Sequence, residues 1–167
     1  MNSQGAETGF EAMDECHRQI HAHLASLSAL ARQLVIDAAN PAAAAQAAVI
    51  EAFFSGTSRQ HHADEERAVF PPLLASADAA LVAAVRNLQQ DHGWIEENWI
   101  ELAPQLRAIA QGNHWVDPAE FQHAVQVFVD LCADHIALEE SLVYPEAKAR
   151  WADALARRVA GRTTPAA

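Results

Sequence analysis

Apolar residues recur every three or four positions along four long segments of the chain, at about residues 10–37, 41–70, 76–112 and 117–144. This is the spacing of one face of an α-helix. A shorter segment with the same spacing follows at about residues 147–159. Because the links between the long segments are short, neighbouring helices should run antiparallel. We therefore expect an all-α fold, an up-down-up-down four-helix bundle with a short C-terminal helix.

Capping residues and prolines predict where these helices begin and end. Asn40-Pro41 and Asp117-Pro118 each place a side chain that can cap a helix directly before a proline suited to the first helical turn. Ser76 is the expected cap of the third helix. Pro71-Pro72 and Pro145 should end the second and fourth helices, because proline lacks a backbone N–H and its ring clashes with the preceding turn.

The chain has 167 residues, a length that suits one domain with a sizeable core. The polar residues 1–9 predict a flexible N-terminal tail, and residues 161–167 predict a disordered C-terminal tail. We therefore expect one bundle domain over residues 10–160.

One motif occurs twice, at His61–Pro71 and again at His135–Pro145. Both copies read H-x-x-x-E-E-x-x-V-(F/Y)-P, and equivalent residues are 74 positions apart. The repeat also extends backwards, since Phe54 and Phe128 are 74 positions apart and lie seven residues before their histidines. Residues four apart share a helical face, so each copy aims an imidazole and a carboxylate at a common point. A duplicated ligand-bearing helix explains this pattern better than chance.

Each long helix carries one histidine at a matching depth in the bundle: His17, His61, His92 and His135. Glu65 and Glu139 lie one turn beyond their histidines, and Glu96 has the same relation to His92. Buried carboxylates are costly unless they are paired or bind a cation. Imidazole and carboxylate together suit iron, manganese or zinc. We therefore expect two metal ions bridged by two glutamates in the bundle core.

The charge balance narrows the classes of partner. The chain has 11 Lys and Arg against 22 Asp and Glu, a formal net charge of −11. This argues against binding to nucleic acid or to an anionic membrane surface, since both require a basic face. The sequence has neither an apolar leader nor a run of 18 apolar residues, and its two cysteines do not form a disulfide framework. We expect a cytoplasmic protein, a monomer or a weak homodimer.

These motifs resemble those of the hemerythrin-like, HHE cation-binding family. Asp14-x-x-His17 on the first helix, the two motif copies, and Asp91-His92 on the third helix carry the resemblance. It implies a non-haem di-iron centre with an oxo or hydroxo bridge, in a protein that binds, stores or senses dioxygen or a related ligand such as nitric oxide or peroxide. Manganese and zinc are possible substitutes for iron. By position, the implied ligands are His17, His61, Glu65, His92, His135 and Glu139.

The chain departs from the dioxygen-carrying hemerythrins at two places. They have a second histidine four residues after the first on helix three, where this chain has Glu96. They end with H-x-x-x-x-D on helix four, where this chain has H-x-x-x-E. Glu96 is a candidate seventh ligand, with a supporting or a solvated role as alternatives. An extra carboxylate would favour ferric iron, which argues against simple reversible oxygen carriage.

Two functions remain open at this point. The first is a di-iron binding protein that stores or senses a small ligand. The alternative is a di-iron enzyme with catalase- or peroxidase-like or nitric oxide-reducing activity. The sequence favours the binding protein and leaves the question of enzymatic activity undecided.

Several residues near the motif have simpler explanations. His62 occupies an apolar slot and is expected to serve packing, with a supporting role beside the ligands as the alternative. Tyr144 is expected to plug the end of the bundle, with a hydrogen bond near the site as the alternative. His21 is the one substitute we would accept as a ligand, whereas His114 should face solvent. The segment 55–58 is poor in helix formers, which predicts either a harmless bend or space beside a metal.

Overall fold

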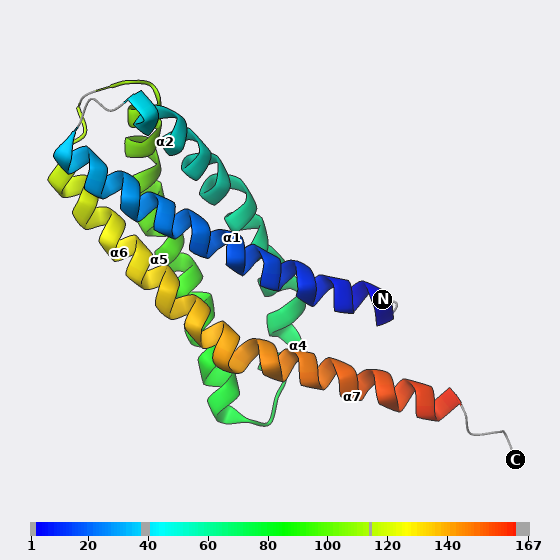
Figure 1. Ribbon diagram of the computed structural model, residues 1–167. Coiled ribbons are helices and arrows are strands. Elements are labelled where there is room, and N and C mark those ends of the chain that lie inside the picture. Colours follow the sequence, from blue (N-terminus) through cyan, green and yellow to red (C-terminus); the bar gives the residue numbers. More distant parts are fainter. Residues whose placement is uncertain (1–2, 38–40, 114, 163–167) are drawn as a thin grey trace, which may run out of the picture.

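The computed structural model describes residues 3–37, 41–113 and 115–162 and consists of helices that form four long rods (Figure 1). The first rod is α1 (Ser3–Ile36), and the third is α5 (Ala79–Ala110). The other two rods are interrupted by five-residue π-helical turns. The expected all-α four-helix bundle is confirmed.

The second and fourth rods share one construction. The second comprises α2 (Pro41–Phe53), the π-turn η1 (Phe54–Ser58), α3 (Arg59–Asp64), the π-turn η2 (Glu65–Val69) and α4 (Phe70–Leu74). The fourth comprises α6 (Pro118–Leu138), the π-turn η3 (Glu139–Val143) and α7 (Tyr144–Arg162). The turns η2 and η3 are 74 positions apart, like the motifs that contain them. The sequence repeat is therefore also a repeat of backbone geometry.

The prediction that prolines end the second and fourth helices is wrong. The rods continue through Pro71-Pro72 and Pro145, and α7 is an extension of the fourth rod. The N–H groups of Phe70 and Tyr144 donate to the carbonyls of Glu65 and Glu139, five residues earlier. Each proline then falls in the first turn of a new α-helical segment, where its missing N–H and fixed φ are tolerated.

Three other expected boundaries also differ. The first helix begins at Ser3 and not at Phe10, so the helix includes most of the expected N-terminal tail. The third helix is capped by Asp78, whose carboxylate accepts from the N–H groups of Ala80 and Leu81. Ser76 instead accepts from the N–H of Asp78. The expected cap at Asp117 is present. The helix α7 runs to Arg162, so the first two residues of the expected disordered tail 161–167 are helical. Asn40, His114 and residues 163–167 lie outside the described residues.

Two apolar clusters fill the bundle and leave a polar layer between them. The larger cluster contains the predicted stripe of α1 and the aromatic residues Phe54, Trp99 and Phe128. The smaller cluster lies towards α4 and α7 and includes Phe70 and Tyr144. The histidines of the motif occur along the chain between residues of these two clusters. No described helix is both long and apolar enough to cross a membrane.

Candidate metal centre

The bundle brings the predicted histidines and two of the predicted glutamates into one buried layer. Glu65 and Glu139 are completely buried, and the His92 side chain is 9% exposed. The residues of this layer come from all four rods: His17 on α1, His61 and Glu65 on the second, His92 on α5, and His135 and Glu139 on the fourth.

The side chains form two groups that could each hold an ion, and within each group the ligand atoms all lie within 4.8 Å of one another. We call the group around His17 the first position and the group around His92 the second position. The first position comprises His17, His61, Glu65 and Glu139. The second comprises His62, Glu65, His92 and His135. Glu65 therefore belongs to both positions.

Each buried glutamate faces one histidine from each position. Oε1 of Glu65 lies 3.5 Å from Nε2 of His61, and its Oε2 lies 3.5 Å from Nε2 of His92. Glu139 has the equivalent arrangement, with Oε2 3.2 Å from Nε2 of His17 and Oε1 3.1 Å from Nε2 of His135. Both carboxylates thus span the two positions, as bridging ligands of a dinuclear site do.

Several buried polar atoms of the layer have no hydrogen-bond partner among the described residues. Seven buried side-chain atoms lack a hydrogen-bond partner within the described part of the chain, and all belong to this layer: His61 Nε2, Glu65 Oε2, His92 Nε2, His135 Nδ1 and Nε2, and both carboxylate oxygens of Glu139. Buried polar groups are normally paired, because an unpaired group loses its hydration without compensation. Mixed nitrogen and oxygen donors aimed at common points fit first-row metal ions.

Burial and mutual contacts shift the protonation of the layer in the metal-free chain. Burial raises the pKa of Glu65 to about 7. Burial also acts to raise the pKa of Glu139, but the close imidazoles of His135 and His17 outweigh it and hold that pKa well below its ordinary value. Burial lowers the pKa of His61 to about 4. His61 is therefore neutral at ordinary pH, the form of imidazole that binds metals.

The second glutamate of each motif copy supports a histidine of another rod. Oε1 of Glu66 lies 3.1 Å from Nδ1 of His92, and Oε1 of Glu140 lies 3.1 Å from Nδ1 of His17. A carboxylate at Nδ1 accepts a hydrogen bond from the N–H of that nitrogen, which leaves Nε2 unprotonated and facing the layer. Sequence reasoning missed this role, although the Glu-Glu doublet in both copies was a visible signal.

Tyr144 reaches into the layer, so its expected role as a simple plug is incomplete. Its hydroxyl donates a hydrogen bond to Oε1 of Glu65 and lies 3.3 Å from Nε2 of His17. Its ring stacks on His17, with centroids 4.9 Å apart. The equivalent residue of the first copy, Phe70, stacks on His92 at 5.5 Å but carries no hydroxyl.

Glu96 lies outside the layer, contrary to its place among the candidate ligands. Nε of Arg59 donates to its Oε2 over 2.7 Å, and this ion pair lies at the surface. A carboxylate that a guanidinium holds near solvent avoids the cost of a third buried charge. His21 is exposed and also lies outside the layer.

His62, in contrast, enters the second position and does more than pack. Its ring stacks on His92, with centroids 4.3 Å apart and an interplanar angle of 18°. Burial and the neighbouring imidazole of His92 lower the pKa of His62 well below its ordinary value. The feature of the sequence that could have indicated this place for His62 is the pair of consecutive histidines at the start of the first copy.

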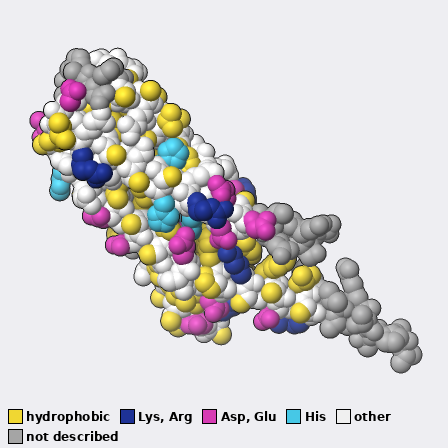
Figure 2. Space-filling model, viewed as in Figure 1, with side chains coloured by type: hydrophobic (Ala, Val, Ile, Leu, Met, Phe, Trp, Pro, Cys, Tyr) yellow, Lys and Arg dark blue, Asp and Glu magenta, His cyan; other side chains and the backbone are white. Residues whose placement is uncertain are grey.

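The surface carries acidic side chains on several parts of the face that Figure 2 presents, with basic side chains beside some of them. Among the described residues, Arg59 pairs with Glu96 and Lys148 pairs with Asp14. The excess acid expected from the net charge of −11 is thus partly neutralised locally.

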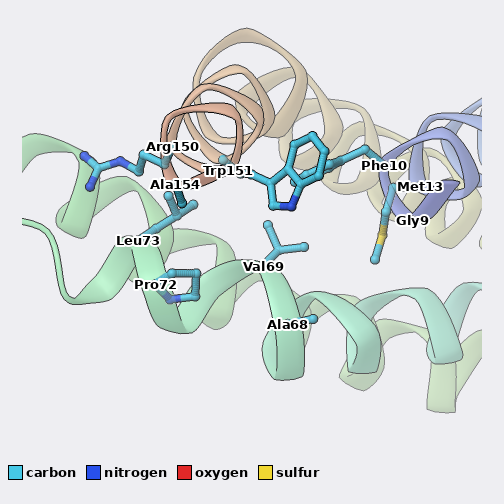
Figure 3. Close-up of a pocket in the computed structure, with 11 residues that line it drawn as sticks. Gly9, Phe10, Met13, Ala68, Val69, Pro72, Leu73, Arg150, Trp151 and Ala154 are labelled. Atoms are coloured by element: carbon cyan, nitrogen blue, oxygen red, sulfur yellow. The ribbon is translucent and has the colours of Figure 1, made fainter. Parts of the chain in front are cut away.

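An apolar pocket of about 490 Å³ lies close to the layer, between α1, α4 and α7 (Figure 3). Met13, Val69 and Trp151 are among the residues that line it. Met13 lies one helical turn before His17, and Val69 follows Glu65 by four residues. In Figure 3 the indole of Trp151 hangs from α7 above Val69, whereas Arg150 extends away.

Comparison with known proteins agrees with this architecture. A protein-family model described as the hemerythrin HHE cation-binding domain matches residues 8–147. An uncharacterized protein of Haemophilus influenzae is 29% identical over 133 residues, which cover 79% of this chain and 74% of that protein. No solved structure matches the chain significantly. The matched range of the family model includes every residue of the two positions.

Proposed function

Because the chain belongs to the hemerythrin HHE cation-binding family, we propose that it holds two iron ions and binds, stores or senses dioxygen or a related small ligand. The ligands are His17, His61, Glu65, His92, His135 and Glu139. Iron at these positions supplies a redox-active ion that takes dioxygen, nitric oxide or peroxide as a ligand. Glu96 is not among the proposed ligands, since its carboxylate pairs with Arg59.

The observation that supports this proposal most strongly is the arrangement of the two glutamates. Each directs one oxygen towards a histidine of the first position and the other towards a histidine of the second. A mononuclear site would not need two spanning carboxylates. Six of the seven unpaired atoms of the layer add to this argument, because bound cations would satisfy them. The seventh, Nδ1 of His135, lies on the other side of its ring, 3.7 Å from Oδ2 of Asp91.

The surroundings of the layer suit a small uncharged ligand. Apolar clusters lie on both sides and keep bulk water away from the donors. The pocket between α1, α4 and α7 has a mostly apolar lining, which suits an uncharged molecule near this end of the bundle. Glu66 and Glu140 hold the rings of His92 and His17 in place while a ligand binds and leaves.

One contact favours the alternative, an enzyme with catalase- or peroxidase-like or nitric oxide-reducing activity. The hydroxyl of Tyr144 lies between Glu65 and His17, inside the layer. Such a hydroxyl can donate a hydrogen bond or pass a proton to a small molecule bound at the first position. The reduction of peroxide and the reduction of nitric oxide both take up protons as water forms.

Metal analysis and visible absorption test the proposal. Protein expressed with added iron should contain two irons per chain, as expected from the two groups of donors. After anaerobic reduction, exposure to air should produce absorption bands that disappear again under vacuum if the protein carries dioxygen. Irreversible oxidation with rapid consumption of peroxide would favour the enzyme. A chain that takes up no iron, manganese or zinc would contradict the metal centre altogether.

A further inference from the structure

The two copies of the motif differ at two residues that face the layer. Directly after the histidine that begins the motif, the first copy has His62 and the second has Ile136. Before the proline, the first copy has Phe70 and the second has Tyr144. Ile136 is 2% exposed and belongs to the larger apolar cluster. The slot thus suits an aliphatic side chain, and an imidazole there requires another explanation.

The surroundings of His62 are unusual for a packing residue. Its ring contacts three other imidazoles, with centroid distances of 4.3 Å to His92, 5.5 Å to His135 and 5.7 Å to His61. Within the described part of the chain, the His62 ring has these contacts with other rings and no side-chain hydrogen bond. Stacking alone gains little for an imidazole, whereas a cation beside the ring would use one of its nitrogens.

The positions of the donor atoms fit this explanation. One ring nitrogen of His62, one carboxylate oxygen of Glu65 and one ring nitrogen each of His92 and His135 lie within 4.8 Å of one another. Metal–nitrogen and metal–oxygen bonds are about 2.0–2.2 Å long, so donors around one ion are separated by roughly 3–4.4 Å. Small rotations of the side chains would bring all four atoms to that spacing.

We propose that His62 is a metal ligand and completes the second position, which then has three imidazoles together with the shared carboxylate of Glu65. This proposal rests on the metal centre proposed above. Consecutive residues of a helix are about 100° apart, so His61 and His62 diverge towards the two positions. Two adjacent residues of one helix thus supply a ligand to each of the two ions.

The assignment also explains why Glu96 can pair with Arg59 at the surface. Glu96 stands where the dioxygen-carrying hemerythrins have a second histidine on the third helix, and here its carboxylate lies at the surface. His62 supplies an imidazole to the second position from the second rod. The second position is therefore complete without a further ligand from α5.

The variant His62→Ile tests this directly, because it introduces the residue that the second copy has at the same slot. We expect the variant to keep the ion of the first position and to bind the second ion at least about tenfold more weakly. The matched control is His21→Ile, which removes an exposed histidine outside the layer and should leave iron content unchanged. Iron content per chain and the Mössbauer spectrum of ⁵⁷Fe-loaded protein report the two ions separately.

A smaller variant separates ligation from folding. His62→Ala should lose the second ion in the same way, and added free imidazole should restore it by occupying the space that the side chain has left. A structural role would not produce such rescue. Circular dichroism establishes that both variants remain helical.

The possible outcomes are distinct. Wild-type protein with two irons, and His62→Ile with one, supports the proposal. The proposal would be overturned, with the metal centre intact, if the wild type and His62→Ile had equal iron content, equal affinities and identical Mössbauer spectra. It would also be overturned if His62→Ala lost the second ion and free imidazole did not restore it. A wild-type chain that binds no metal would overturn the centre itself, and this proposal with it.

Discussion

The hydroxyl of Tyr144 donates a hydrogen bond to Oε1 of Glu65, although the two residues belong to opposite copies of the repeated motif. The contact therefore joins the second and fourth rods inside the buried layer. Because Phe70 occupies the place of Tyr144 in the other copy, Glu139 has no equivalent partner. The two glutamates thus differ in their surroundings, although their spacing in the sequence is the same.

Replacement of Tyr144 by phenylalanine should destabilise the metal-free protein, because one oxygen of the buried Glu65 loses its donor. Hydrogen bonds to charged groups contribute about 1.5–3 kcal/mol, so above pH 7, where Glu65 is ionised, the free energy of unfolding should fall by roughly that amount. Urea unfolding in the presence of a chelator measures the change. Arg59→Gln, which breaks an ion pair at the surface, serves as a control and should have a smaller effect. Equal stability of Tyr144→Phe and wild type would mean that the hydrogen bond contributes little.

Replacement of Glu139 by glutamine should lower metal content sharply, because the amide keeps the shape of the side chain but loses its charge and one of its two acceptor oxygens. His61→Ala should have a similar effect, since the first position loses one of its imidazoles. Glu96→Gln is the matched control, and we expect it to retain the metal content of the wild type. Metal analysis of the three purified variants gives the comparison. Unchanged stoichiometry in the first two, or a loss in the control, would contradict the ligand assignment.

Replacement of Glu66 or Glu140 by glutamine should weaken metal binding without abolishing it. Each carboxylate accepts from the outer nitrogen of a histidine in the layer, and removal of such partners typically lowers affinity by about 10–100-fold. Competition with a chromophoric chelator measures the affinity. Glu97→Gln changes an exposed glutamate of α5 and should bind metal as the wild type does. An effect as large as that of Glu139→Gln would indicate direct ligation.

The stability of the metal-free chain should depend on the protonation of Glu65. Its pKa is raised from 4.5 to about 7, so the folded state holds this proton more tightly than the unfolded state does. The corresponding stabilisation is complete below pH 4.5 and is lost as the pH rises through 7. A shift of this size corresponds to on the order of 3 kcal/mol.

Glu65→Gln removes this titration and isolates its contribution. As the pH rises from 4.5 to 8, the free energy of unfolding of the metal-free variant should increase relative to that of the wild type, by up to about 3 kcal/mol. Urea unfolding at several pH values, with a chelator present, provides the data. Parallel curves for the two proteins would show that Glu65 titrates normally in the fold.

The amino-acid sequence by itself determined the helices and the spacing of the ligands along each one. The period of apolar residues predicts four long helices, and helical geometry places His61 with Glu65, and His135 with Glu139, on common faces. These are local relations that the rise and rotation of a helix set. The prediction of iron and of its oxo or hydroxo bridge came from the family resemblance, because the spacing of the ligands does not distinguish iron from other metals.

Only the tertiary structure decided which side chains from different rods meet. Glu96 has the same helical relation to its histidine as Glu65, yet Arg59 holds it at the surface, and His62 and Tyr144 take places in the layer that their sequence positions did not predict. The prolines likewise lie within continuous rods because π-turns precede them. The depth and rotation at which helices pack depend on contacts between residues far apart in the chain, and no local pattern records them.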